Sequence, residues 1–197
     1  MGLLDLEKHF AFYGAYHSNP TNVAIHILFV WPLLFTAIIL LYFTPPIFSP
    51  SRTLLNYIHP VFVFNLGFIF TVFYGLFYAA LDIKAGSFVA VLTFLCWVSS
   101  SFVANSLGFE LAWKVVLVAQ LTGWIGQFIG HGAFEKRAPA LLDNLAQALL
   151  MGPFFVILEI LQSTIGYEPY PGFQTNVKAR IEANIKEWQD KKQKKSS

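Results

Sequence analysis

The stretch V-A-I-H-I-L-F-V-W-P-L-L-F-T-A-I-I-L-L-Y-F, residues 23–43, contains no Asp, Glu, Lys or Arg. A helix that crosses the ~30 Å hydrocarbon core of a bilayer needs about 20 residues of this kind. Across the 197 residues of the chain, 56% are hydrophobic and only 12% are charged. A soluble domain of this length could not bury so much apolar surface. We therefore expect an integral membrane protein.

Further uncharged runs place the other membrane segments. We expect an all-α protein with about four transmembrane helices, at residues 23–43, 61–81, 86–105 and 112–131. A proline-rich loop, T-P-P-I-F-S-P-S-R, separates the first two spans, because proline cannot continue a helix. A tight turn, D-I-K-A-G, separates the second span from the third.

Two more helices are expected in the C-terminal part of the chain. Residues 145–161 are apolar but contain Gly152 and Pro153, so we predict a re-entrant or half-buried helix rather than a fifth crossing. Residues 173–195 are polar apart from one helical stripe, which predicts a C-terminal amphipathic helix. The sequence leaves two placements open for this helix, the membrane surface and the protein itself. The stripe consists of Val177, Ile181, Ile185 and Trp188.

Positive charge is unevenly distributed along the chain. If the N-terminus is cytosolic and four helices cross, only Arg52 and Lys114 of the 13 Lys and Arg residues lie on the far side. This asymmetry favours cytosolic N- and C-termini. Lys194 and Lys195, close to the C-terminus, resemble the dilysine retrieval signal of endoplasmic reticulum membrane proteins, which is read in the cytosol. We therefore expect a multi-pass protein of the endoplasmic reticulum membrane.

The domain organisation is simple, since no internal repeat or low-complexity linker is present. We expect a membrane-embedded domain, residues 1–165, followed by a basic cytosolic amphipathic tail, residues 166–197. The net charge of +2 is too small to indicate binding of nucleic acid. The sequence gives no indication of the oligomeric state.

Polar residues at membrane depth mark candidate functional sites, because they are costly to place there. At the end of the fourth expected span, in Q-F-I-G-H-G-A-F-E, the residues Gln127, His131 and Glu135 follow one another at intervals of four. On a helix they lie on one face. Gly126 and Gly130 form a G-x3-G pair, which lets a neighbouring helix approach closely.

Two further histidines flank the start of the first expected span. His17 ends the apolar face of a short N-terminal helix, and an Asn-Pro dipeptide breaks that helix. On the next helix Asn22 and His26 are four residues apart and share a face. The first span starts, and the fourth ends, on the same side of the membrane. We therefore expect His17, His26 and His131 to converge near that surface.

Three converging neutral imidazoles can bind a metal ion. The residues alone leave iron and zinc open, and they leave a second reading, a non-catalytic lipid-binding or scaffold protein with interfacial histidines. His9 and His59 lie elsewhere, and we interpret Cys96 as a small buried hydrophobic residue. Five histidines are too few for the histidine-box di-iron enzymes of membranes, and no H-E-x-x-H motif of a zinc protease is present.

Three stretches resemble the fungal endoplasmic reticulum 2-hydroxy fatty acid dioxygenase family, whose founding yeast member acts in phytosphingosine breakdown. They are G-L-L-D-L at residues 2–6, F-Y-G-A-Y-H-S-N-P-T-N-V-A-I-H-I-L-F-V at residues 12–30, and Q-F-I-G-H-G-A-F-E-K-R-A-P-A-L-L-D-N at residues 127–144. The resemblance covers about residues 1–165, although the middle spans match only in being apolar.

The resemblance implies an Fe(II)-dependent α-oxidation. A long-chain 2-hydroxy fatty acid and O2 would give a fatty acid one carbon shorter, as a step of sphingolipid catabolism. The family's essential histidines match His17, His26 and His131, which would be catalytic residues and metal ligands in a catalytic domain of residues 1–165. The acyl chain would lie along the Phe-rich spans, next to membrane lipid.

Residues around this metal site are expected to support it. Asn22, Gln127 and Glu135 are candidates for orienting the histidine ligands, since such ligands usually donate their other N–H to a neighbouring group. Glu135 is also a candidate fourth ligand, and its alternative is a helix-end salt bridge with Lys136 or Arg137. Lys136 and Arg137 are candidates for contacting the substrate carboxylate.

Overall fold

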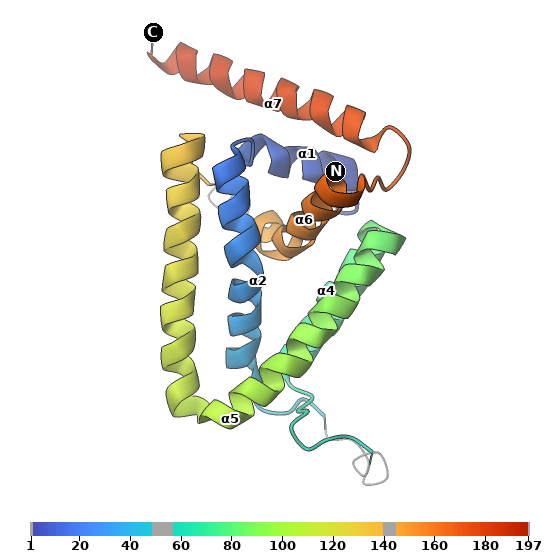
Figure 1. Ribbon diagram of the computed structural model, residues 1–197, viewed down its shortest axis with the longest axis vertical. Helices are drawn as coiled ribbons and strands as arrows, with labels where there is room; N and C mark the ends of the chain where they lie inside the picture. Colours follow the sequence, from blue (N-terminus) through green and yellow to red (C-terminus); the bar gives the residue numbers. More distant parts are fainter. Residues whose placement is uncertain (1, 49–56, 140–144, 197) are drawn as a thin grey trace. The chain divides into compact units, whose positions relative to one another are not determined.

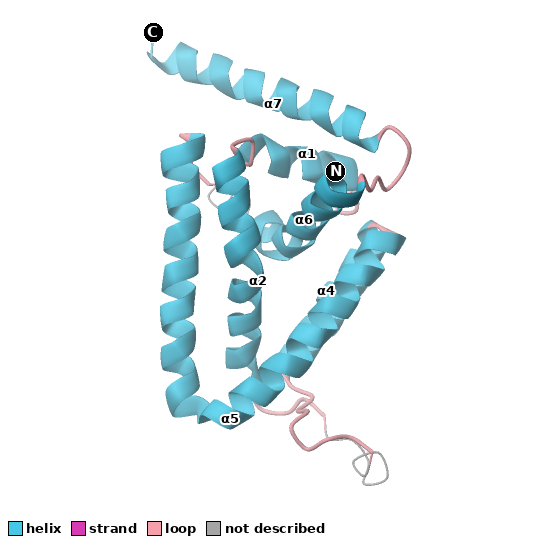
Figure 2. Ribbon diagram, in the orientation of Figure 1, coloured by secondary structure: helices cyan, strands magenta, loops and turns pink. Residues whose placement is uncertain are grey.

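The computed structural model describes residues 2–48, 57–139 and 145–196 (Figure 1). Within these ranges the chain is helical and has no strand, which confirms the all-α fold class (Figure 2). The elements are α1 (Leu6–Tyr16), α2 (Pro20–Tyr42), α4 (Leu66–Leu81), α5 (Ile83–Ile129), a π-helical turn η1 (Gly130–Glu135), α6 (Leu145–Ile165) and α7 (Phe173–Ser196).

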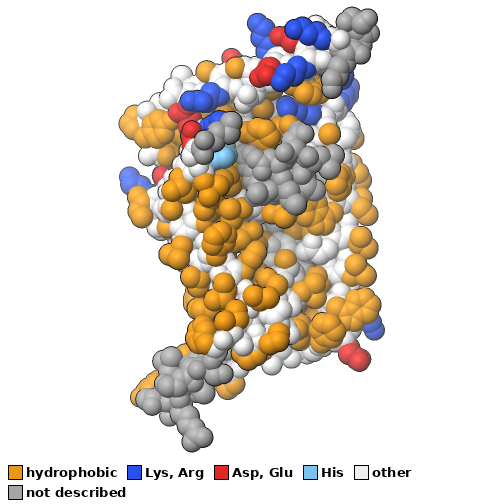
Figure 3. All heavy atoms as spheres, turned by 180° about the vertical axis from the view of Figure 1, so that it is seen from behind, with side chains coloured by type: hydrophobic (Ala, Val, Ile, Leu, Met, Phe, Trp, Pro, Cys, Tyr) orange, Lys and Arg blue, Asp and Glu red, His pale blue; other side chains and the backbone are white. Residues whose placement is uncertain are grey.

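Within the described ranges, three helical segments are long and apolar enough to cross a membrane: Pro20–Tyr42, Ile83–Glu135 and Ala148–Ile165. The helix α4 is apolar but has only 16 residues. Large hydrophobic side chains are exposed along α4 and α5, among them Leu76 and Phe94. Figure 3 shows hydrophobic side chains over much of the face in view. Exposed apolar surface of this extent is typical of helices that face lipid.

The chain divides into two compact units, Leu28–Gly126 and a second unit formed by Met1–Ile27 with Gln127–Ser197. In the first unit, α4 begins later than the expected span 61–81 because Asn65 caps it. The Asn65 side-chain oxygen accepts the N–H of Gly67 at 3.0 Å. The expected proline-rich loop is described as far as Phe48, and its remainder, including Arg52, lies outside the described residues.

The expected spans 86–105 and 112–131 are the two limbs of α5, joined by a sharp bend rather than by a loop (Figure 1). The bend is at Gly108, where φ is 67° and ψ is 163°. Only glycine adopts this conformation readily. Small side chains near the bend let α2 pack closely against both limbs. This core consists of Ile39, Ala104, Ala112 and Val116.

The second unit contains α1, α6 and α7. The helix α6 is continuous through Gly152 and Pro153, so it is not a re-entrant hairpin. Because Ala148–Ile165 is long and apolar enough to cross a membrane, its placement as a half-buried helix that does not cross stays a prediction. Its buried face includes Phe154 and Phe155, and both side chains are fully buried. Phe155 lies edge-on to Phe10 of α1, with ring centroids 5.4 Å apart. Apolar packing between α1 and α6 therefore anchors the N-terminal helix.

The C-terminal helix α7 packs on α1, one of its two expected placements. Glu7 of α1 accepts hydrogen bonds from Tyr170 and Asn176 and forms an ion pair with Arg180 at 2.5 Å. Gly14 leaves no room for a side chain beside Ile181 of the predicted stripe. The first half of α7 is thus part of the protein's own packing. Figure 3 shows Lys and Arg side chains gathered over α7.

Candidate metal centre

The first two histidines flank a break between helices. The helix α1 ends immediately before His17, and Pro20 begins α2, where its missing N–H leaves no helical hydrogen bond unmade. The side-chain oxygen of Asn19 accepts the N–H of Thr21 at 2.9 Å, which caps α2. Because the chain turns here, His17 and His26 face each other.

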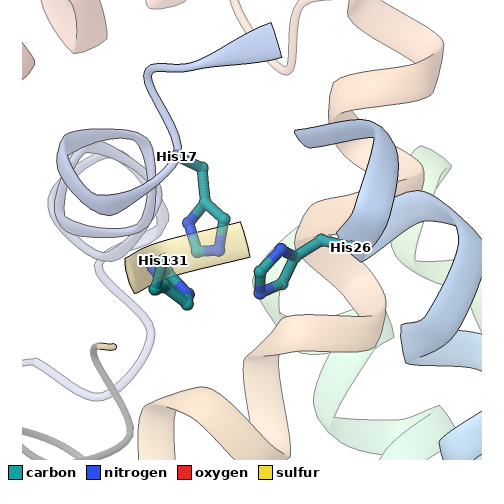
Figure 4. Close-up of side chains that lie close together, drawn as sticks. All are labelled: His17, His26 and His131. Atoms are coloured by element: carbon teal, nitrogen blue, oxygen red, sulfur yellow. The ribbon is translucent and has the colours of Figure 1, made fainter. Parts of the chain in front are cut away.

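Three histidines meet from this break, from α2 and from η1 (Figure 4). The ring centroids are 4.3 Å apart for His17 and His26, 5.0 Å for His17 and His131, and 4.8 Å for His26 and His131. One nitrogen of each ring lies within 4.8 Å of the others. The side chains are buried, with exposures of 9%, 5% and 3%. The structure thus brings together the three histidines that the sequence predicts to converge.

Backbone carbonyls fix the tautomers of two of these rings. Nδ1 of His17 lies 2.7 Å from the carbonyl oxygen of Tyr13, and Nδ1 of His26 lies 2.9 Å from that of Asn22. A carbonyl only accepts, so Nδ1 carries the hydrogen in both rings and Nε2 keeps a free lone pair. This is the arrangement in which histidine binds a metal ion through Nε2.

Two nitrogens of the cluster are buried without a hydrogen-bond partner among the described residues, Nε2 of His17 and Nδ1 of His131. Leaving a buried polar atom unpaired costs about 1–3 kcal/mol. A metal ion among the three rings would satisfy these atoms. The donor set therefore fits a metal ion, although three imidazoles alone do not select which one.

Tyr13 supports His17 in two ways. Its ring stacks on the imidazole, with centroids 4.0 Å apart, and its carbonyl accepts the Nδ1 hydrogen. Burial, followed by the nearby His26, lowers the pKa of His17 well below its ordinary value, so the ring is neutral at physiological pH. The neutral ring is the form that binds metals.

The Tyr13 hydroxyl donates to Oε2 of Glu159 on α6 at 2.9 Å. Burial, and then the charge of Glu159, raise the pKa of Tyr13 well above its ordinary value, so the hydroxyl keeps its proton. Sequence reasoning missed this pair as part of the site. The available signal was that Glu159 is the only carboxyl within the apolar segment 145–161.

Glu135 connects the two histidine-bearing segments. Its Oε1 accepts the backbone N–H of Asn19 at 2.7 Å and the side-chain amide of Asn22 at 3.2 Å, and its Oε2 accepts the Ser18 hydroxyl at 2.8 Å. Asn22 is fully buried and also donates to the carbonyl oxygen of Tyr16 at 3.1 Å. Both carboxylate oxygens are thus occupied by donors from the helix break. This geometry suits a residue that positions the ligands better than a fourth ligand.

A π-helical turn carries the third histidine. In η1 the backbone is wider than an α-helix, which changes the face that each residue presents. The intervals of four therefore do not keep Gln127, His131 and Glu135 in one row. Gly130 lies against the Asn22 side chain, where any Cβ would collide with its oxygen. The glycine is required for this close approach of η1 and α2.

The remaining predicted residues lie around the site without contacting the histidines. Among the described residues, Gln127 makes no hydrogen bond to the three rings, and Glu135 makes no ion pair with Lys136 or Arg137. The Arg137 guanidinium lies 3.5 Å from the ring centroid of Tyr16 and donates to the carbonyl oxygen of Ala15. Lys136 is exposed, with a left-handed backbone that ends the π-turn. A contact of either residue with a substrate stays a prediction.

Replacing Glu135 with alanine should lower metal affinity about 10–100-fold, the usual effect of losing a group that orients a ligand. The change unpairs donors on Ser18, Asn19 and Asn22, and Asn22 holds His26. Competition with a metal chelator measures the affinity, and Glu110→Ala, at an exposed carboxylate, is the matched control. Glu135→Gln should have a smaller effect because it keeps one acceptor oxygen. Unchanged metal affinity in Glu135→Ala would exclude a role at the site.

Comparison with known proteins gives the family. A family model described as "2-hydroxy-palmitic acid dioxygenase Mpo1-like" matches residues 3–164. A relative from Saccharomyces cerevisiae (strain ATCC 204508 / S288c), named 2-hydroxy-palmitic acid dioxygenase MPO1, is 35% identical over 184 residues, which cover 93% of this chain and 91% of the relative. No solved structure matches the chain. The match to the family model spans most of the chain and includes all three clustered histidines. The chain therefore belongs to the Mpo1-like family.

Proposed function

We propose that this chain is an Fe(II)-dependent dioxygenase that shortens long-chain 2-hydroxy fatty acids by one carbon. One observation carries the proposal: three buried imidazoles lie together, and two of them have a buried nitrogen without a partner among the described residues. They do so in a chain of the family named for a 2-hydroxy-palmitic acid dioxygenase. A metal ion explains the histidine cluster, and the family name supplies the class of substrate and the second reactant, O2.

Iron is preferred to zinc for a chemical reason. Three imidazoles fit either ion, but zinc has no redox chemistry and a dioxygenase must activate O2. Bound iron(II) would supply that redox chemistry, with coordination positions left open beyond His17, His26 and His131. The chain's own residues perform the other tasks, which are to hold the rings neutral, to fix their tautomers and to exclude water.

The same observations count against a non-catalytic membrane protein with interfacial histidines. Histidines that anchor a protein at the membrane surface keep a polar edge towards water or headgroups. Here the three side chains are at most 9% exposed and face one another. Their burial therefore supports a metal site.

The reaction balances with O2 as its only oxidant. A 2-hydroxy acid, R–CH(OH)–COOH, and O2 give R–COOH, CO2 and H2O, so the C1–C2 bond breaks and the substrate supplies all four electrons. No reductase or 2-oxoglutarate is required. The test is whether protein loaded with Fe(II), but not with Zn(II), forms the shortened acid.

We place the enzyme in the endoplasmic reticulum membrane, with both termini cytosolic, and assign it to phytosphingosine breakdown. The distribution of Lys and Arg, the terminal dilysine and the apolar helices support the location. The sphingolipid pathway rests on the family resemblance, because phytosphingosine degradation yields a 2-hydroxy fatty acid.

The topology predicts opposite outcomes for two engineered glycosylation sites. An acceptor added after Ser197 should remain unmodified, whereas one placed in the 44–57 loop should be glycosylated, because only the loop would reach the lumen. A shift in gel mobility on treatment with endoglycosidase shows whether each site carries a glycan. The control for each site is the same protein with the acceptor asparagine removed. Glycan on the C-terminal acceptor would contradict the proposed orientation.

A further inference from the structure

Beside the metal centre, one unit of the chain has an open cavity of about 400 Å³ between α1, α6 and α7. This volume lies within the ~300–1,000 Å³ range of small-molecule sites. His17 forms part of its wall, so the cavity reaches the metal centre directly. Phe10, Val177 and Ile181 contribute apolar side chains to the wall.

Most of the side chains that line this cavity are polar, and three of them suit the head group of a hydroxy acid. Lys178 of α7 has no ion-pair partner among the described residues. Glu159 of α6 uses Oε2 to accept from the Tyr13 hydroxyl, and its Oε1 has no partner among the described residues. Gln162 has an amide nitrogen with no partner in the described part of the chain. The cavity thus offers a cation, an amide donor and a carboxyl oxygen as an acceptor, beside further amide and hydroxyl groups of Gln174, Ser18 and Ser163.

Packing holds the helix that carries Lys178 and the side chain of Glu159. Two residues beyond Lys178, Arg180 forms an ion pair with Glu7 of α1, and Val177 is buried, so this turn of α7 is held on α1. Tyr13 donates to Glu159 while stacking on His17. Lys178 itself is exposed, so its ammonium group is free to contact a ligand in the cavity that Glu159 and His17 also line.

We propose that this cavity binds the head group of the 2-hydroxy acid, with Lys178 facing the carboxylate and the free oxygen of Glu159 accepting the 2-hydroxyl hydrogen. The inference rests on the proposed function and adds the residues that select its substrate. A fatty acid without the hydroxyl would make one hydrogen bond fewer at Glu159, so the site would bind it less tightly.

Lys178 takes the role for which the sequence suggested Lys136 and Arg137. Neither of those residues lines the cavity, and the Arg137 guanidinium is engaged with the Tyr16 ring and a backbone carbonyl. Lys178 was not distinguishable in the sequence from the other lysines of the C-terminal tail. Only the packing of α7 on α1 places it beside His17.

Equilibrium binding of radiolabelled 2-hydroxypalmitate to the metal-free, full-length protein tests the carboxylate contact. Lys178→Ala should weaken binding about tenfold, as expected for loss of a charged hydrogen bond. Lys178→Arg should restore most of it. Lys186→Ala, at an exposed lysine of α7 that does not line the cavity, should bind like the wild type. Equal binding by Lys178→Ala and Lys186→Ala would overturn the proposal.

The hydroxyl contact has a separate readout, the ratio of the affinities for 2-hydroxypalmitate and palmitate. Glu159→Leu should lower this ratio about tenfold, because only the hydroxy acid loses a hydrogen bond. If Glu159 acted only by holding Tyr13, both acids would weaken equally, and the proposed contact would be wrong. Product formation by the Fe(II)-loaded wild type tests the proposed function independently. The two tests can give different answers. If the wild type forms product but Lys178→Ala binds 2-hydroxypalmitate normally, the proposed function stands and the assignment of the cavity is refuted.

Discussion

Alanine at His17, His26 and His131 together should remove bound iron and abolish turnover, while the protein stays helical and soluble in detergent. About one iron per chain is expected in wild-type protein purified without oxygen. Each imidazole would supply one ligand to the ion, and the structure offers no other donor within reach among the described residues. Elemental analysis and circular dichroism of the two proteins measure both outcomes.

Among the three single substitutions, His131→Ala tests the ligand assignment with the least disturbance of the surrounding structure. In His17→Ala and His26→Ala the carbonyl oxygens of Tyr13 and Asn22 lose their hydrogen-bond donors. Each lost hydrogen bond lowers the free energy of unfolding by about 0.5–1.5 kcal/mol. The Nδ1 atom of His131 has no partner, so His131→Ala removes a ligand with less damage to its surroundings. It should lower iron affinity more than about 100-fold, beyond the effect of losing an orienting group.

His9→Ala is the matched control, because His9 is a partly buried histidine of α1 that does not belong to the cluster. It should keep both iron and activity. Iron retained at wild-type stoichiometry in the triple variant would show that the ligands have been wrongly assigned. Loss of iron with loss of helicity would instead indicate unfolding, and His131→Ala then decides the question.

The convergence of the three histidines could be predicted because it depends only on segment order. A break after His17 and an even number of crossings between His26 and His131 bring their ends to one side of the membrane. Helical periodicity and uncharged runs give that information. The same reasoning predicted α2, α4 and α7, since each is bounded by a clear change in composition or by a break.

Features that depend on contacts between distant residues could not be predicted. The π-turn at Gly130–Glu135 alters the helical register, so the interval of four between His131 and Glu135 does not place them as it would on a regular α-helix. Glu135 binds groups more than one hundred residues away in the sequence. The pair of Tyr13 and Glu159 likewise forms only when α6 packs on α1. Periodicity within one segment contains no information on such pairs.

The largest difference in rate is expected between 2-hydroxypalmitate and palmitate. Protein loaded with Fe(II) should convert 2-hydroxypalmitate and O2 to the fifteen-carbon acid and CO2, without added 2-oxoglutarate. Palmitate lacks the hydroxyl group whose carbon is oxidised, and it also loses the contact proposed for Glu159. We expect it to react more than about 100-fold more slowly, as when a polar group of a site is left unpaired.

Chain length should matter in the same assay. Each methylene transferred from water to an apolar environment contributes about 0.8 kcal/mol, so long 2-hydroxy acids should be better substrates than short ones until the chain exceeds its binding region. Mass spectrometry of the shortened acids gives the rates for a series of lengths. A rate independent of length would show that only the head group is bound.

The decisive form of this experiment compares metals and co-substrates side by side. Fe(II) should support formation of the fifteen-carbon acid and Zn(II) should not, since both ions fit three imidazoles but only iron can pass electrons to O2. The four electrons released when C2 becomes a carboxyl carbon and C1 leaves as CO2 equal those that reduce one O2. One O2 should therefore be consumed for each fifteen-carbon acid formed. Product that appears only with 2-oxoglutarate, or equally with zinc, would refute this reaction even if the histidines bind a metal.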